Sequence, residues 1–471
     1  MRPLVAALAI LLLPIAPAAG TARAADCVST KAPRDFDGDG LDDIVVGDPF
    51  ADAGGQAGAG AVQVTTGTPV ATKPSVITVP EAAPGDSFGW SAAIGHFDGD
   101  RCADLLVGAP YADSGGLRDA GAAYIVYGGT RRTERLTAPE PQQDAHFGWS
   151  VAYTPEGEGV VAIGAPHEDD AGVRDAGAVY VRAAASSSEA PLRITQNGEG
   201  VPGNSEAGDM FGWALALGRL AGDAAGVDLA VGVPYENEDG AGRQDGQGML
   251  DTGALIVVFD PLTGGRSGVR WGLTELGEAG EPVKPGSGDR FGYALAAAGG
   301  RLAVGAPLAD AGSVPDAGLV HVFRSTGGRE LVKGDTIRQG DGSTEGTAAT
   351  GDGFGFSVAL TAGPDAQDVR LAAGIPFDGP ERRGAVQLVP LADRAGDRLL
   401  TSPTPRPDEH FGWAVAFTGN RLAAGAPDSG TGSGGGGAVG LLGRNEGAFT
   451  QVAPAPGGGG APVDFGASLA G

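Results

Sequence analysis

Short apolar runs alternate with turns rich in Gly, Pro and Asp along most of the chain. Three kinds of run recur in a fixed order: one begins at a Phe-Gly pair (residues 87–97), one ends at Gly-x-Pro (residues 104–110), and one follows a further loop (residues 120–128). Runs of this length between turn residues predict β-strands. Pro ends the second strand because it has no N–H to donate to a ladder. Looser runs such as residues 75–80 predict a fourth strand.

These runs repeat with a constant period. Phe-Gly pairs begin at Phe88, Phe147, Phe211, Phe291, Phe354, Phe411 and Phe465. The mean interval is (465 − 88)/6, about 63 residues. The Gly-x-Pro triplets have the same mean spacing, and they begin at Gly47, Gly108, Gly164, Gly232, Gly305, Gly374 and Gly425. Four short strands per period, with no amphipathic helix between them, indicate one blade of a β-propeller.

The two ends of the repeat complement each other. Gly47 has no Phe-Gly pair before it in the mature chain, and Phe465 has no Gly-x-Pro after it. Joining residues 464–470 to the N-terminal segment makes seven complete units and covers two open sheet edges. We therefore predict an all-β fold. It is a seven-bladed β-propeller of four-stranded antiparallel blades, closed by the C-terminal strand joining the N-terminal blade.

The paired signatures resemble the FG-GAP repeats of integrin α-subunit propellers and of many secreted bacterial proteins. The resemblance covers nearly all of residues 34–471 and rests on seven concordant copies of Phe-Gly and Gly-x-Pro. It implies the propeller fold and calcium sites in hairpins between the first two strands of a blade. It implies less about function, because one fold hosts many functions.

Residues 1–24 have the features of a secretory signal peptide, with Arg2, an apolar run over residues 4–13 and a small-x-small site at its end. We predict a signal peptide at 1–24, a single propeller domain at 25–471, and a secreted, extracellular protein without a membrane anchor. Export permits disulfides, and the two cysteines are Cys27 and Cys102. We predict that they are joined, with two separate thiols as the alternative.

Composition adds a strong negative charge. The chain has 58 acidic and 32 basic residues and a formal net charge of −26. This balance argues against binding to nucleic acid or to an anionic membrane, since both would repel the protein. Gly and Pro, at 85 and 33 residues, reach a fraction seen in disordered chains, but here they recur with the repeat.

One loop has the spacing of a calcium site. Asp35, Asp37, Asp39 and Asp43 stand at positions 1, 3, 5 and 9 of a loop with a turn glycine at position 6, and the carbonyl of Leu41 would add an oxygen. Ca²⁺ prefers such clustered oxygen ligands. We predict that this loop binds Ca²⁺, with a solvated Asp/Gly turn as the alternative.

A second loop keeps part of the same pattern. Asp98, Asp100 and Asp104 stand at positions 3, 5 and 9, and Cys102 stands where the carbonyl would bind. His96 replaces the first Asp, and it is a weak ligand for a hard cation. We predict a weaker calcium site here, with a structural turn as the alternative. The Cys102 side chain would remain available to bridge Cys27.

Two further features recur from blade to blade. Aspartates six residues apart follow Gly-x-Pro in three units, as at Asp113 and Asp119. This spacing favours loops that are held by Asx-type hydrogen bonds, with an acidic face that gathers cations or basic ligands as the alternative. An aromatic residue follows most Phe-Gly pairs, as at Trp149 and Trp213. We interpret this slot as a packing position, with a glycan-binding surface as the alternative.

The sequence contains no His-Glu-x-x-His motif. We therefore predict a secreted, calcium-binding, non-enzymatic propeller. It would act as a monomeric extracellular binding or adhesion module for an unidentified protein or glycan. The alternative is a propeller hydrolase or lyase with an active site near the central axis, which would need polar groups with perturbed pKa values on one face.

Overall fold

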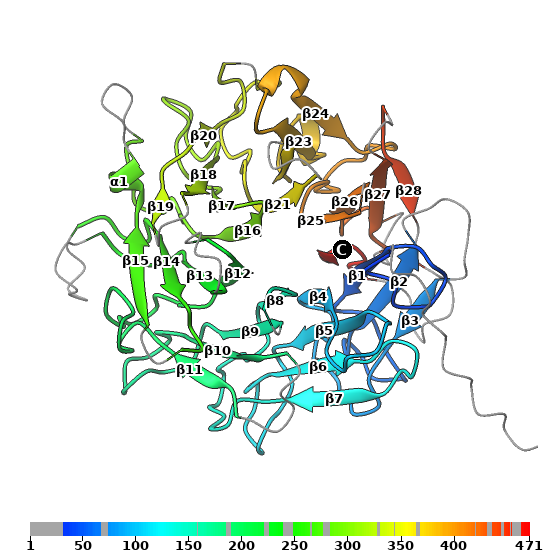
Figure 1. The fold of residues 1–471 in the computed structure, drawn as a ribbon. Coiled ribbons are helices and arrows are strands. Elements are labelled where there is room, and N and C mark those ends of the chain that lie inside the picture. Colours follow the sequence, from blue (N-terminus) through cyan, green and yellow to red (C-terminus); the bar gives the residue numbers. More distant parts are fainter. Residues whose placement is uncertain are drawn as a thin grey trace, which may run out of the picture.

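The computed structural model describes residues 32–471, apart from 67–73, 158, 185–189, 221–225, 239–247, 264–265, 277–282, 327–329, 343, 364–367, 420, 431–435, 444–446, 453 and 455–462. Seven antiparallel sheets are arranged around a central axis (Figure 1). This confirms the predicted seven-bladed β-propeller. The predicted signal peptide and Cys27 lie outside the described residues, so cleavage and the disulfide to Cys102 remain predictions.

In each blade the strand that follows the Phe-Gly pair lies nearest the axis (Figure 1). From the innermost strand outward, blade one consists of β29 (Ser468–Ala470), β1 (Asp43–Asp48), β2 (Ala61–Thr66) and β3 (Ser75–Ile77), and blade two consists of β4 (Ala92–Gly95), β5 (Asp104–Ala109), β6 (Ala122–Val126) and β7 (Thr133–Leu136). Blade three consists of β8 (Val151–Thr154), β9 (Val160–Ala165), β10 (Ala178–Ala183) and β11 (Leu192–Ile194), and blade four consists of β12 (Ala214–Gly218), β13 (Asp228–Val233), β14 (Ala254–Phe259) and β15 (Ser267–Trp271).

Blades five to seven follow the same order. Blade five consists of β16 (Ala294–Ala298), β17 (Arg301–Ala306), β18 (Leu319–Ser325), β19 (Leu331–Val332) and β20 (Thr336–Ile337). Blade six consists of β21 (Ser357–Ala362), β22 (Val369–Ile375), β23 (Ala385–Pro390) and β24 (Arg398–Thr401). Blade seven consists of β25 (Val415–Thr418), β26 (Arg421–Ala426), β27 (Ala438–Gly443) and β28 (Thr450–Val452). In blade five, β19 and β20 both pair with β18. The described helices are short: α1 (Leu273–Leu276), η1 (Pro380–Arg382) and η2 (Arg394–Gly396).

The ring closes as the repeat count predicts. β29, from the C-terminal end, pairs antiparallel with β1 and becomes the innermost strand of blade one. The N–H of Gly466 donates to the carbonyl of Gly47 over 3.0 Å. The Ser468 hydroxyl donates to the carbonyl of Gly89 in blade two over 2.7 Å. The last strand is therefore bonded on both sides.

The two repeat signatures meet between neighbouring blades. All seven Phe side chains of the Phe-Gly pairs are at most 2% exposed. Within blade two, the N–H of Gly89 donates to the carbonyl of Gly108. A Cβ on Gly108 would collide with the carbonyl oxygen of Gly148 in blade three, so only glycine allows this approach.

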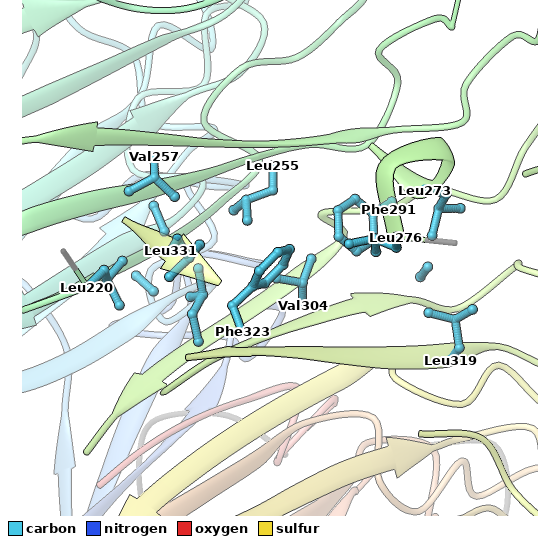
Figure 2. Close-up of a cluster of buried hydrophobic side chains, with 14 of the residues drawn as sticks. Leu220, Leu255, Val257, Leu273, Leu276, Phe291, Val304, Leu319, Phe323 and Leu331 are labelled. Atoms are coloured by element: carbon cyan, nitrogen blue, oxygen red, sulfur yellow. The ribbon is translucent and has the colours of Figure 1, made fainter. Parts of the chain in front are cut away.

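The core lies between facing sheets. One cluster joins blades four and five, where Leu255 and Val257 of β14 face Val304 of β17 and Phe323 of β18 (Figure 2). The short helix α1 adds Leu273 to the same cluster. Each blade therefore depends on its neighbours to bury its apolar faces. None of the helices in the described part of the chain is long and apolar enough to cross a membrane.

Candidate metal loops and aromatic ring

The first acidic loop is folded around the side chain of Asp35. Its Oδ1 accepts the N–H groups of Gly38 and Asp39 over 2.7 and 3.1 Å, and its Oδ2 accepts the N–H of Gly40 over 2.9 Å. Carboxylate oxygens of Asp35, Asp37 and Asp39 all lie within 4.8 Å of one another. The structure thus brings together three of the four carboxylates that the spacing singled out.

Asp43, the fourth, heads β1 and is fully buried. Its Oδ2 accepts the N–H groups of Phe36 and Asp37, but its Oδ1 has no hydrogen-bond partner among the described residues. Burial, and then the charge of Asp37, raise the pKa of Asp43 to about 8. A divalent cation would offset the burial of this charge and the repulsion within the loop, so these residues fit a metal. Leu41 is 43% exposed, and its carbonyl remains a predicted ligand.

The second acidic loop brings together all three of its predicted carboxylates. Oxygens of Asp98, Asp100 and Asp104 lie within 4.8 Å of one another. Asp104 is buried, accepts the N–H groups of Phe97 and Gly128, and has its pKa raised to about 6, chiefly by burial.

His96 changes the chemistry of this second loop. One ring nitrogen lies 3.0 Å from the carbonyl oxygen of Cys102, and the other lies 2.9 Å from that of Pro33. Carbonyl oxygens only accept hydrogen bonds, so a neutral ring donates to one of the two and a protonated ring donates to both. In either case the ring lies against the Cys102 oxygen that the sequence predicted as a metal ligand. The second loop therefore fits a cation less well than the first.

Aromatic side chains form an arc at the other end of the blades from these loops. Each acidic loop lies between the end of an inner strand and the start of the second strand of the blade. The aromatic residue that follows a Phe-Gly pair lies just before an inner strand begins, which is the opposite end of the blade. We call six of these side chains the aromatic ring: Trp90, Trp149, Trp213, Tyr293, Phe356 and Trp413. Their neighbouring centroids are 4.8, 4.8, 5.6, 5.2 and 4.7 Å apart, and all six are partly exposed. In blade one the slot holds Ala467, so the aromatic ring is open there.

A second set of side chains packs against the aromatic ring. The residue after Gly-x-Pro is aromatic or His in five blades, and these residues are Phe50, Tyr111, His167, Tyr235 and Phe377. Each contacts the aromatic ring, with centroid distances between 5.4 and 6.4 Å. Sequence reasoning missed this outer set, although its fixed offset from Gly-x-Pro was a usable signal.

Two histidines extend this aromatic surface. His146 and His167 have ring centroids 4.8 Å apart. Burial, and then the neighbouring His167, lower the pKa of His146 to about 4. Burial also lowers the pKa of His167, against the opposing effect of Asp175. At neutral pH, the His146 side chain is therefore an uncharged imidazole within this aromatic surface.

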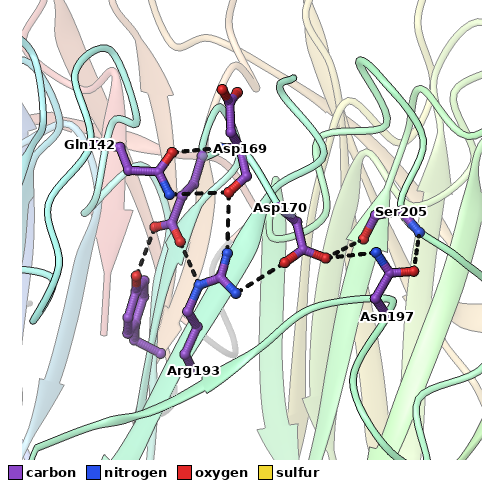
Figure 3. Close-up of polar contacts among 8 residues, drawn as sticks. Gln142, Asp169, Asp170, Arg193, Asn197 and Ser205 are labelled. Carbon is purple, nitrogen blue, oxygen red and sulfur yellow. Dashed lines mark hydrogen bonds and ion pairs between the residues drawn. The ribbon is translucent and has the colours of Figure 1, made fainter. Parts of the chain in front are cut away.

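A polar network holds the loop that carries His167. Arg193 of β11 pairs with Glu168 over 2.6 Å and with Asp170 over 3.0 Å (Figure 3). Asp170 also accepts hydrogen bonds from Ser205 and Asn197. Burial by itself would raise the pKa of Asp170, but these donors and Arg193 lower it. The network fixes the outer end of blade three beside the aromatic ring.

The paired aspartates also have a structural role. Asp113 accepts the N–H of Asp119 over 3.1 Å, and the equivalent bonds from Asp175 to Asp169 and from Asp316 to Asp310 measure 3.0 and 3.2 Å. Each second Asp has a positive φ near 50°. The predicted Asx-type bonds are therefore present in all three loops.

Comparison with known families agrees with this geometry. Two models described as FG-GAP repeat match residues 32–65 and 88–126, and residues 130–182 and 285–323. The chain therefore contains FG-GAP repeats. It is also similar to integrin alpha-PS2 of Drosophila melanogaster, with 32% identity over 166 residues. This match covers 33% of the FG-GAP chain and 11% of the fly protein. The seven blades are consistent with an integrin α-like N-terminal propeller.

Proposed function

We propose that this FG-GAP protein is a secreted, calcium-binding module that binds an extracellular protein or glycan through its aromatic ring. The observation that carries the proposal is the continuous arc of six partly exposed aromatic side chains. Clustered aromatic surface that remains accessible marks binding sites. The likeness to an integrin α subunit supports a binding or adhesion role outside the cell or at a membrane.

The proposal assigns different roles to the two ends of the propeller. The aromatic ring contacts the partner, and calcium held by Asp35, Asp37, Asp39 and Asp43 stiffens the opposite end of blade one. The seven inner strands carry one titratable side chain, Tyr153, and otherwise small, apolar or hydroxyl-bearing residues. This lining favours the binding module over the alternative of an enzyme with an axial active site.

A binding experiment tests the role of the aromatic ring. The intact secreted protein is immobilised and exposed to a glycan array and to extracellular proteins of its own organism. A Trp149→Ala/Trp213→Ala variant is expected to lose at least tenfold in affinity for the captured partner, since buried aromatic anchors dominate such interfaces. Leu262→Ala is the control, because Leu262 is 43% exposed and lies in the loop after β14, near Glu156 and so at the end of the blades where the inner strand β8 ends. Equal binding by both variants would disprove the assignment.

A further inference from the structure

A cavity of about 290 Å³ lies between blades five and six. Its walls include Arg301 of β17 and Arg324 of β18, together with apolar side chains of blade six such as Val369 and Leu391. A volume of this size accommodates a small ligand or one sugar unit.

The two arginines stand directly opposite each other. Arg301 and Arg324 are register partners in the antiparallel pair of β17 and β18, so their side chains leave the same face of the sheet. Like charges in opposed positions destabilise a sheet. Among the described residues, no carboxylate lies within 4.0 Å of either guanidinium, and Arg301 donates only to the carbonyl of Gly300.

One carboxylate lies at the edge of the cavity. Asp335 lines it, but its side chain is 65% exposed and pairs with Arg394 over 3.7 Å. The local charge is therefore positive in a molecule whose formal net charge is −26. Guanidinium groups bind carboxylate, sulfate and phosphate through paired hydrogen bonds.

We propose that this cavity, with Arg301 and Arg324, is a binding site for a compact oxyanion. The anion would be a carboxylate, sulfate or phosphate group, either as a free ion or carried on an acidic sugar. It would separate the two opposed guanidinium groups and relieve their repulsion. The site is independent of the aromatic ring and of the acidic loops.

Blade seven provides a matched control. Arg421 begins β26 as Arg301 begins β17, within the similar sequences RLAAGAP and RLAVGAP. In blade seven, however, the opposite residue is Gly443, so Arg421 has no second arginine facing it. Removing Arg421 changes net charge as removing Arg301 does, but leaves the cavity unchanged.

Calorimetric titration of the full chain with sulfate, in buffer of low ionic strength, tests the proposal. We expect saturable binding at one site. Arg301→Gln/Arg324→Gln should weaken it at least tenfold, Arg421→Gln should change it less than twofold, and Asp335→Asn should tighten it because a repelling carboxylate is removed. Sulfate should also raise the melting temperature of the wild type more than that of the double variant.

A second titration, with glucuronate, distinguishes the two sources of the anion. Tighter binding of glucuronate than of sulfate indicates an acidic sugar that also contacts the apolar walls, whereas the reverse order indicates a free ion. The proposal is overturned if neither anion binds saturably, or if the double glutamine variant binds as the wild type does. Melting temperatures in chloride alone verify that each variant is folded.

Discussion

The most constrained positions in the molecule are the glycines of the two signatures. Gly108 lies against the carbonyl of Gly148 in the next blade, and equivalent contacts join Gly164 to Gly212 and Gly374 to Gly412. Serine hydroxyls donate to the same carbonyls, as Ser91 does to that of Gly148 over 2.9 Å. The signatures therefore specify the spacing between blades as well as the strands within them.

The first prediction concerns Gly108. We expect Gly108→Ala to lower the free energy of unfolding by about 1–3 kcal/mol, because the added methyl forces two blades apart. Gly447→Ala is the control, since nothing lies within 4 Å of a Cβ at that position. Chemical denaturation of both variants measures the difference. Equal stability of the two variants would show that the blades separate without cost.

A buried carboxyl recurs two residues before several of the Phe-Gly pairs. Asp289 accepts the N–H of Gly286, and Asp352 accepts that of Ala349. Burial raises the pKa of each to about 6, well above the ordinary value of 3.8. Ionisation of these groups therefore opposes folding. Their stabilising contribution is complete below pH 3.8 and is lost as the pH rises through 6.

This shift predicts how an asparagine variant responds to pH. Asp289→Asn keeps an acceptor for Gly286 but cannot ionise, so its stability should rise relative to the wild type between pH 4 and pH 7. The gain is at most about 3 kcal/mol, from a pKa of about 6 against 3.8. Glu140→Gln, at an exposed position, should show no such trend. Melting curves across this pH range measure the difference in stability between the Asp289→Asn variant and the wild type. A difference that does not change with pH would contradict the prediction.

At the scale of single elements, the first acidic hairpin should act as a calcium-dependent stabiliser of blade one. Chelation is expected to lower the melting temperature, because Asp43 and its neighbours then lose the cation that offsets their burial. Asp37→Ala should remove most of this sensitivity. Asp113→Ala also weakens a loop, yet it should keep the full response to chelator. An unchanged melting temperature of the wild type in chelator would contradict the calcium assignment.

The second hairpin offers the converse experiment. His96→Asp with Arg101→Gly restores the first ligand and the turn glycine of the loop pattern, and frees the carbonyl of Cys102 from the imidazole. We expect the second loop to bind calcium at least tenfold more tightly, measured by calorimetric titration. Arg101→Gly alone should not produce this gain. Equal affinity in the double variant and the wild type would show that another feature limits the loop.

The element scale also shows why the sequence predicted some features and missed others. Strands and hairpins follow from local spacing, which the repeat presents seven times. The carboxylates at 98, 100 and 104 follow from the spacing within their own loop. The contact of His96 with Pro33 joins residues 63 positions apart, and no local pattern encodes it. The sequence showed the aromatic slots as separate positions, but the ring contacts of Trp149 with Trp90 and Trp213 depend on the angle between blades.

At the scale of the whole molecule, the seven blades share one continuous set of interfaces. The core clusters join neighbouring sheets, and blade one is complete only when the C-terminal strand is in place. Phe465, which is 2% exposed, packs in a cluster with Ile44 and Val46 of β1. The two ends of the sequence are therefore coupled through one sheet, which the unpaired signatures at Gly47 and Phe465 had indicated.

Removal of residues 464–471 tests this closure. The truncated protein loses the strand that covers β1 and the buried ring of Phe465, a loss worth about 3–5 kcal/mol for the ring alone. Because each blade packs on two neighbours, we expect a lower melting temperature for the whole molecule and greater protease sensitivity at blades one and seven. A synthetic peptide of residues 464–471 should restore the melting temperature, and a scrambled peptide should not. If the truncated protein melts as the full chain does, the ring is held by its other interfaces and the closing strand is dispensable.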